Sequence, residues 1–159
     1  MRKTAELLSL AALAALLFFA VNIYFGPHQL PNTIPTHFNG AGQPNGWGSR
    51  GALLLFPIFA AGLYLFLTLI SRFPSLFNFP VPVTELNRAQ LEGLALDLLA
   101  WIKVEIILFS GWMELLWVYA IRHPGSVFGP FPVFVFVAIL FATIIGHIIA
   151  MFRARNSAE

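Results

Sequence analysis

The stretch from Leu7 to Phe25 reads LLSLAALAALLFFAVNIYF and contains no charged residue. A helix of about 20 apolar residues is long enough to cross the hydrocarbon core of a bilayer, which is about 30 Å thick. Across the chain, 58% of the residues are apolar and only 10% are charged, against about 25% charged in soluble proteins. Three further stretches share this character: Gly51 to Ile70, about Leu98 to Ala120, and about Phe131 to Phe152.

These four stretches predict an all-α fold, an integral membrane four-helix bundle formed by one domain over residues 1–159. We expect helices at about 7–25, 51–70, 85–122 and 131–152. Arg2 and Lys3 precede the first stretch, which also suits a cleaved secretory signal. Signal cores have about 7–15 apolar residues, whereas this stretch runs on to Phe25 with no small-residue cleavage site after it. We therefore expect an uncleaved helix.

Composition also excludes several kinds of site and partner. The chain has no cysteine, which excludes disulfides and thiolate metal sites. Its formal charge of +2 is small and dispersed, and so indicates no nucleic-acid partner. The lipid bilayer is the partner that the composition predicts. We expect no cofactor, and a homodimer is left open.

Lysine and arginine are divided unequally between the two sides of the predicted bundle. If the N-terminus is cytoplasmic, six of these basic residues lie on the inner side and two lie on the outer side, as the positive-inside rule requires. We therefore expect a multi-pass protein of the cell membrane with both termini cytoplasmic. The inner residues are Arg2, Lys3, Arg72, Arg88, Arg153 and Arg155, and the outer ones are Arg50 and Arg122.

The segment from Gly26 to Arg50 differs in composition from the rest, with four prolines and five glycines. It contains the turn dipeptides Asn39-Gly40 and Asn45-Gly46. Unstructured loops of this length are uncommon in compact domains. We therefore expect an ordered cap on the extracytoplasmic face, between the first and second helices. In the inner loop, Thr84 is a candidate N-cap for a helix that begins at Glu85.

Charged residues within the hydrocarbon core are costly unless they are paired or hydrated. The third predicted helix has two polar faces at 100° per residue. One face holds Asp97, Trp101, Glu105 and Trp112, and the other holds Glu92, Lys103, Ser110 and Glu114. A helix with two polar faces needs partners on both sides, so we expect it at the centre of the bundle or at a dimer interface.

Residue counting places Lys103, Glu105 and His147 in the cytoplasmic third. Lys103 and Glu105 are two residues apart and cannot pair along one helix. We therefore expect Glu105 to meet His147 between the third and fourth helices, as a structural pair or as a proton or ligand relay. Lys103 is expected to turn towards a carbonyl, a cavity or the headgroups.

We predict no metal site, and one alternative is left open. Three histidines and one carboxylate belong to the outer side, where together they would suit zinc with an open coordination position. No two of them have a helical ligand spacing, which favours ordinary hydrogen bonding within the cap. These metal-ligand candidates are His28, His37, His123 and Glu114.

The cap sequence LPNTIPTHFN (30–39), followed by GQPNGWGSR (42–50), resembles the signature of the family called domain of unknown function 1648. That signature reads roughly L-P-x-x-I-P-x-H-F-x-x-x-G-x-P-D-x-W-G-S-K. Asn45 stands where aspartate is commoner, and Arg50 where lysine is. The resemblance covers residues 7 to 70 and implies binding residues in the cap: Pro35, His37, Phe38, Asn39, Gly42, Pro44, Trp47, Gly48 and Arg50.

The same domain forms the N-terminal part of SdpI-type membrane proteins. Their named representative is an immunity protein against a secreted peptide toxin and a membrane signalling component. The resemblance therefore implies a non-enzymatic protein whose outer cap binds a peptide or small-molecule ligand, in immunity or signalling. The chain has fewer predicted helices than a full-length SdpI-type protein. Two alternatives remain: a small proton-coupled transporter using Glu105, Lys103 and His147, and a membrane enzyme with a histidine metal site.

Overall fold

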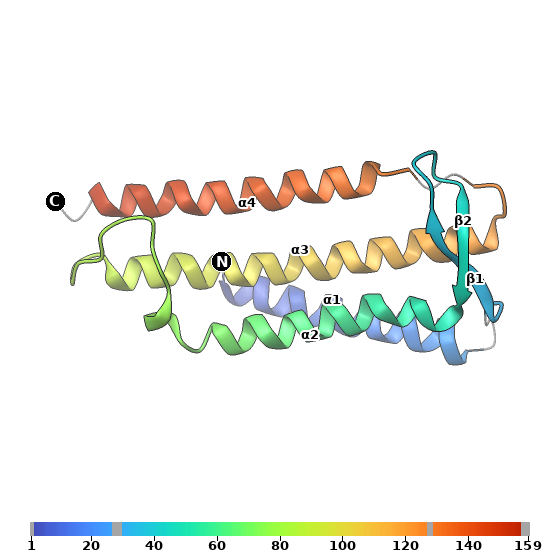
Figure 1. Cartoon of the computed structure of the whole chain (residues 1–159). Helices are drawn as coiled ribbons and strands as arrows, with labels where there is room; N and C mark the ends of the chain where they lie inside the picture. Colours follow the sequence, from blue (N-terminus) through green and yellow to red (C-terminus); the bar gives the residue numbers. More distant parts are fainter. Residues whose placement is uncertain (1, 27–29, 127–128, 157–159) are drawn as a thin grey trace.

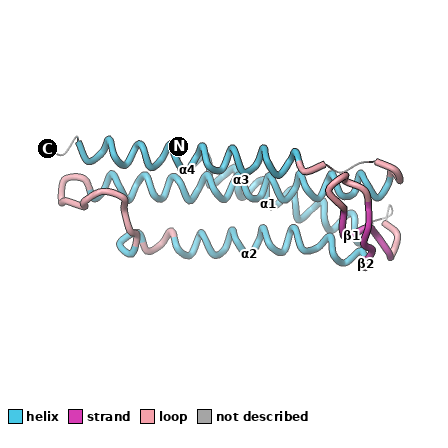
Figure 2. The backbone as a smooth tube through the Cα atoms, turned by 45° about the horizontal axis from the view of Figure 1, so that its top comes forward, coloured by secondary structure: helices cyan, strands magenta, loops and turns pink. Residues whose placement is uncertain are grey.

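The computed structural model describes residues 2–26, 30–126 and 129–156. Four long helices run alternately up and down, so both ends of the chain point to one end of the bundle (Figure 1). A small hairpin lies at the opposite end of the bundle (Figure 2). The mostly helical four-helix fold is therefore confirmed. The helices are α1 (Arg2–Phe25), α2 (Leu55–Ile70), α3 (Arg88–Arg122) and α4 (Phe131–Asn156).

Helix α1 begins at Arg2, five residues before the predicted start. The prediction began where the apolar stretch begins, but residues 2–6 contain neither proline nor glycine and continue the helix. Glu6 therefore lies inside α1. This corrects the expectation that the first helix carries no charge within its length.

The second and third helices also begin later than predicted. A 3-10 helix, Arg50–Leu54, precedes α2, and the Ser49 hydroxyl caps it by accepting from the Gly51 amide at 3.2 Å. Before α3, the Thr84 amide donates to Asn87 Oδ1 at 2.8 Å, and the Asn87 amide donates back to Thr84 Oγ1 at 3.3 Å. These reciprocal bonds, of the capping-box kind, form a turn over residues 84–87, and α3 begins directly after it at Arg88. The predicted start at Glu85 is therefore wrong by three residues.

The predicted cap is a β-hairpin, which the all-α expectation did not include. Strand β1 (Thr33–Phe38) pairs antiparallel with β2 (Pro44–Ser49). At the tip, Asn39 Oδ1 accepts from the amides of residues 41 and 43, and Gly42 has a φ of 76°. Added Cβ atoms at Gly46 and Gly48 would lie 2.9 Å from side-chain carbons of β1. These two glycines let the strands approach.

Helix α3 is the central element of the bundle, as its two polar faces predicted. It packs against α1, α2 and α4, whereas α4 packs mainly on α3.

Within the described residues, three helical segments are long and apolar enough to cross a membrane: Arg2–Phe25, Arg50–Ile70 and Phe131–Ala154. Helix α3, with 35 residues, is also long enough to cross a membrane, but it carries more charged residues and is not one of these three segments. Large apolar side chains, including Phe18 and Phe134, are exposed on the outside of the bundle, where they suit contact with lipid.

Candidate functional site

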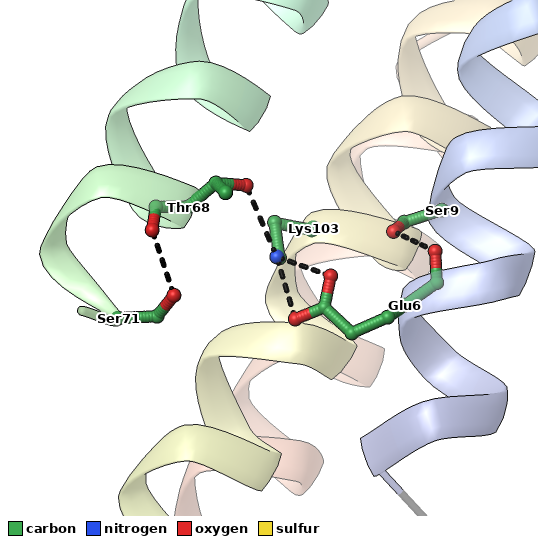
Figure 3. A network of polar contacts seen from close by, with 5 residues as sticks. All are labelled: Glu6, Ser9, Thr68, Ser71 and Lys103. Atoms are coloured by element: carbon green, nitrogen blue, oxygen red, sulfur yellow. Dashed lines mark hydrogen bonds and ion pairs between the residues drawn. The ribbon is translucent and has the colours of Figure 1, made fainter.

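Lys103 lies at the centre of a polar network that joins three helices (Figure 3). Its Nζ is 2.7 and 2.5 Å from the two carboxylate oxygens of Glu6 on α1, and it donates to Thr68 Oγ1 on α2 at 3.3 Å. The Tyr64 ring lies 5.1 Å from the same nitrogen. Lys103 is 1% exposed, so the ammonium exchanges water for these partners. The network ties α1, α2 and α3 together.

The expected environment of Lys103 was therefore wrong. The lysine turns neither to a carbonyl nor to the headgroups, because Glu6 provides a carboxylate at the same level of the bundle. The ion pair depends on the longer α1, since the first turns of that helix carry Glu6. Around it, Ser9 and Ser71 donate their hydroxyls to the backbone carbonyls of Glu6 and Thr68.

Glu105 and His147 were expected to meet between α3 and α4, but the structure gives each of them another hydrogen-bond partner. The Thr143 hydroxyl on α4 donates to Glu105 Oε1 at 2.5 Å. His147 Nδ1 is bonded to the Thr143 carbonyl at 2.9 Å, within its own helix. Thr143, one helical turn before His147, therefore takes the position next to the carboxylate. The helices meet as predicted, and the partner residue differs.

The two polar faces of α3 are directed to different neighbours. Asp97 and Trp101 line a cleft against α4, and Glu105 bonds to that helix. Lys103, on the other face, turns to α1 and α2. Trp112 departs from the expected grouping, because it lines an apolar groove against α1 instead.

Glu114 is the most enclosed acid of α3, at 1% exposure. Its Oε2 is buried and has no hydrogen-bond partner within the described part of the chain. The residue lines a small cavity beneath the hairpin, together with Tyr24 and Arg50. Arg50 donates to the Leu30 carbonyl at 3.3 Å, and its guanidinium lies 5.1 Å from the Tyr24 ring. A buried carboxylate and a basic residue therefore share the junction between hairpin and bundle.

The hairpin is fixed to the bundle through Trp117 of α3. Its indole Nε1 donates to the Pro35 carbonyl of β1 at 2.5 Å, and its ring makes an edge contact with Phe56 at 5.4 Å. Within the hairpin, His37 Nδ1 is hydrogen-bonded to Asn45 Oδ1. Trp47 on β2 is 65% exposed. His37 thus has the partner that an ordered cap requires, and Trp47 projects outward.

Two pockets adjoin the Trp117–Pro35 pair, one lined by Trp117 and the other by Pro35. One, of about 320 Å³, has His37 and Asn39 at its hairpin side and an apolar floor of Phe56, Met113 and Trp117. The other, of about 380 Å³, is lined by Pro35, Trp47 and residues of the α3–α4 connection. Pockets of this size, apolar with a few polar groups, are typical of ligand sites.

The candidate metal ligands are separate where the structure describes them. His37 is bonded to Asn45, and His123 stacks on Tyr119 with ring centroids 4.1 Å apart. Glu114 lies in the cavity below the hairpin. His28 lies outside the described residues. Among residues 2–26, 30–126 and 129–156, no group of three histidine or carboxylate side chains is placed to hold a metal ion.

Residues 11–61 match the family model described as Domain of unknown function (DUF1648). The chain carries a DUF1648 domain. The DUF1648 match includes most of α1, the whole hairpin, the 3-10 helix and the start of α2. It therefore contains the Arg50–Tyr24 contact, whereas Glu6, Thr68 and Lys103 lie outside it.

A relative of the chain extends beyond the DUF1648 domain. An uncharacterized protein of Archaeoglobus fulgidus is 29% identical over 146 residues, in a match that covers 84% of this chain and 76% of that protein. No solved structure matches the chain. The similarity to this protein therefore covers more of the chain than residues 11–61.

Sequence reasoning missed four residues that organise these sites: Glu6, Thr68, Thr143 and Trp117. A search for carboxylates among the first residues of the chain would have found Glu6, because a buried lysine requires a counter-ion. Residue spacing gave no reason to connect Trp117 with the cap, yet its indole bonds to β1 of the DUF1648 domain. Thr68 and Thr143 carried no distinguishing signal, since threonine is common in membrane helices.

Proposed function

We infer that this is a non-enzymatic multi-pass protein of the cell membrane, of the SdpI-like class, whose hairpin binds a peptide or small-molecule ligand at the outer face. The observation that carries the proposal is the Trp117–Pro35 hydrogen bond, with an aromatic pocket beside it. A ligand entering this pocket contacts the hairpin and α3 together. The DUF1648 domain and the likeness of residues 30–50 to SdpI-type proteins support a role in immunity or membrane signalling.

The central position of α3 gives ligand binding a route to the other side. Trp117 lies near one end of α3, and Asp97 lies near its beginning. A displacement of the hairpin that moves Trp117 therefore acts on a helix that contacts every other helix. The transporter alternative finds less support, because Lys103 pairs with Glu6 on a different side of α3 from Glu105 and His147.

Site-specific photocrosslinking tests the ligand pocket. A benzophenone amino acid at position 56, which lines the pocket, is expected to capture a peptide or small molecule in native membranes, detected by mass spectrometry. The matched control is position 66, a phenylalanine of the same helix that is 57% exposed and faces away from the core. Capture of lipid alone at both positions would reject the proposal. Loss of the position-56 adduct in a Trp117→Phe background would support it.

The orientation is tested with single cysteines, since the chain has none of its own. We expect a cysteine at Ala41, on the hairpin tip, to react with an impermeant maleimide in intact cells. A cysteine at Ser75, in the exposed loop between α2 and α3, should react only after the membrane is opened. The reverse pattern would place the hairpin in the cytoplasm and contradict an outer ligand site.

A further inference from the structure

A second cleft, remote from the hairpin, lies between α3 and α4. Its lining residues belong to the first turns of α3 and the later turns of α4, and α4 runs towards the end of the bundle to which the termini point (Figure 1). The volume of the cleft is about 360 Å³. Asp97 and Trp101 line it from α3, and Thr143, Gly146 and His147 line it from α4. Nothing lies within 4 Å of a Cβ added at Gly146. Because glycine has no side chain, open space remains at this position on the α4 side of the cleft.

Asp97 is the acidic residue among the described residues that line the cleft. Its Oδ1 is buried and has no hydrogen-bond partner within the described part of the chain. The same holds for Oε2 of Glu105, which bonds to the lining residue Thr143 but does not itself line the cleft. Two polar groups beside Asp97 already have partners: the Thr143 hydroxyl bonds to Glu105 Oε1, and His147 Nδ1 bonds to a backbone carbonyl. Lys103 is held by Glu6 on the other side of α3. Among the described lining residues there is no lysine or arginine.

The lining indicates the chemical class of the missing partner. Carboxylate oxygens favour a cation, and the aromatic face of Trp101 attracts an ammonium group in particular. A bare metal ion suits the cleft less well, because an indole supplies no ligand and the described residues contain no cluster of three metal-binding side chains. A cleft of this volume also exceeds the needs of one ion. An organic cation satisfies both the charge and the aromatic wall.

We propose that the α3–α4 cleft binds an ammonium group, with Asp97 as its counter-ion and Trp101 against its face. Two sources carry this chemistry in a membrane: the headgroup of an aminophospholipid and a free amphipathic amine. The cleft lies between α3 and α4, and α4 has its main contacts with α3 rather than with α1 or α2, which suits entry of either source from the bilayer. The site is independent of the proposed ligand pocket at the hairpin.

The free-amine source is tested by titrating phenethylamine into the purified protein and measuring the heat of binding. Its neutral isostere, 2-phenylethanol, should bind at least about tenfold more weakly, because it lacks the charge that pairs with Asp97. Asp97→Asn should weaken amine binding by at least about tenfold. Glu92→Gln is the matched control, since Glu92 pairs with Arg88 on the same helix outside the cleft. The Glu92→Gln variant should bind phenethylamine as tightly as the wild type does.

The lipid source is tested by native mass spectrometry of protein released from bilayers of equal phosphatidylethanolamine and phosphatidylglycerol. Retention of phosphatidylethanolamine that Asp97→Asn abolishes would assign the cleft to a headgroup. Binding of phenethylamine that depends on Asp97 would assign it to a free amine. Trp101→Leu, with Trp112→Leu as its control in a different groove, provides a second variant should Asp97→Asn fail to fold. If neither ligand depends on Asp97 or Trp101, the proposal is overturned.

Discussion

Replacing Glu6 with alanine is expected to destabilise the bundle by about 3 kcal/mol. Removing one member of a buried ion pair costs about 3–5 kcal/mol, because the remaining charge loses its partner in a poorly solvated site. The Lys103 side chain is fully buried, whereas that of Glu6 is 34% exposed, which places the loss towards the lower end of that range. Unfolding in mixed micelles, followed by circular dichroism, measures the change.

Two comparisons make the Glu6 experiment specific. The double variant Glu6→Leu/Lys103→Met should recover most of the lost stability, because it removes both charges and keeps the volume. Glu92→Gln breaks the Arg88–Glu92 pair, whose atoms are 3.7 Å apart near the surface, and should cost less than about 1 kcal/mol. If Glu6→Ala is as stable as the wild type, Lys103 extends to the headgroups instead. The network of Glu6, Lys103 and Thr68 would then not stabilise the fold.

Replacing Trp117 with alanine is the second change with a large expected effect. It removes the hydrogen bond to Pro35, the ring contact with Phe56 and the packing beside Leu30, Ile34 and Leu53. Truncation of a large packed aromatic side chain costs about 3–5 kcal/mol. Because its contacts join α3 to the hairpin, we also expect the hairpin tip to become sensitive to limited proteolysis while the helical circular dichroism signal stays.

Trp47 provides the matched control for Trp117. It is the same residue type in the same cap, yet it is 65% exposed, so Trp47→Ala should change the unfolding free energy by less than about 0.5 kcal/mol. Trp117→Phe should lose less than the alanine variant, because a phenyl ring keeps the Phe56 contact. Equal stability of Trp117→Ala and Trp47→Ala would show that the hairpin is held by other contacts.

The helices were predicted well because their signals are local. Apolar length located α2 and α4, and the prolines of the inner and outer loops marked where α2 and α3 end. The start of α1 was missed because hydropathy reports where lipid begins, whereas the helix itself extends into the polar residues before Leu7. That difference of five residues hid Glu6 and with it the partner of Lys103.

The hairpin and the contacts between the helices could not be predicted from the spacing of residues along the sequence. Asn39-Gly40 and Asn45-Gly46 were both interpreted as turns, but only the first lies at the hairpin tip. The second lies in β2, where Gly46 accommodates His37. For Glu105, counting residues gave the correct neighbouring helix. The level along α4 was wrong by one turn: Thr143 and His147 are four residues apart on the same face of α4, and Thr143 is the one that bonds to Glu105.

The separation of 97 residues between Glu6 and Lys103 constrains how the protein is made. When α1 leaves the ribosome, the lysine that its carboxylate needs has not yet been synthesised. The Glu6–Lys103 pair can therefore form only after Lys103 of α3 has been synthesised. This contact between the first and third helices is completed late in synthesis, and not as each helix leaves the ribosome.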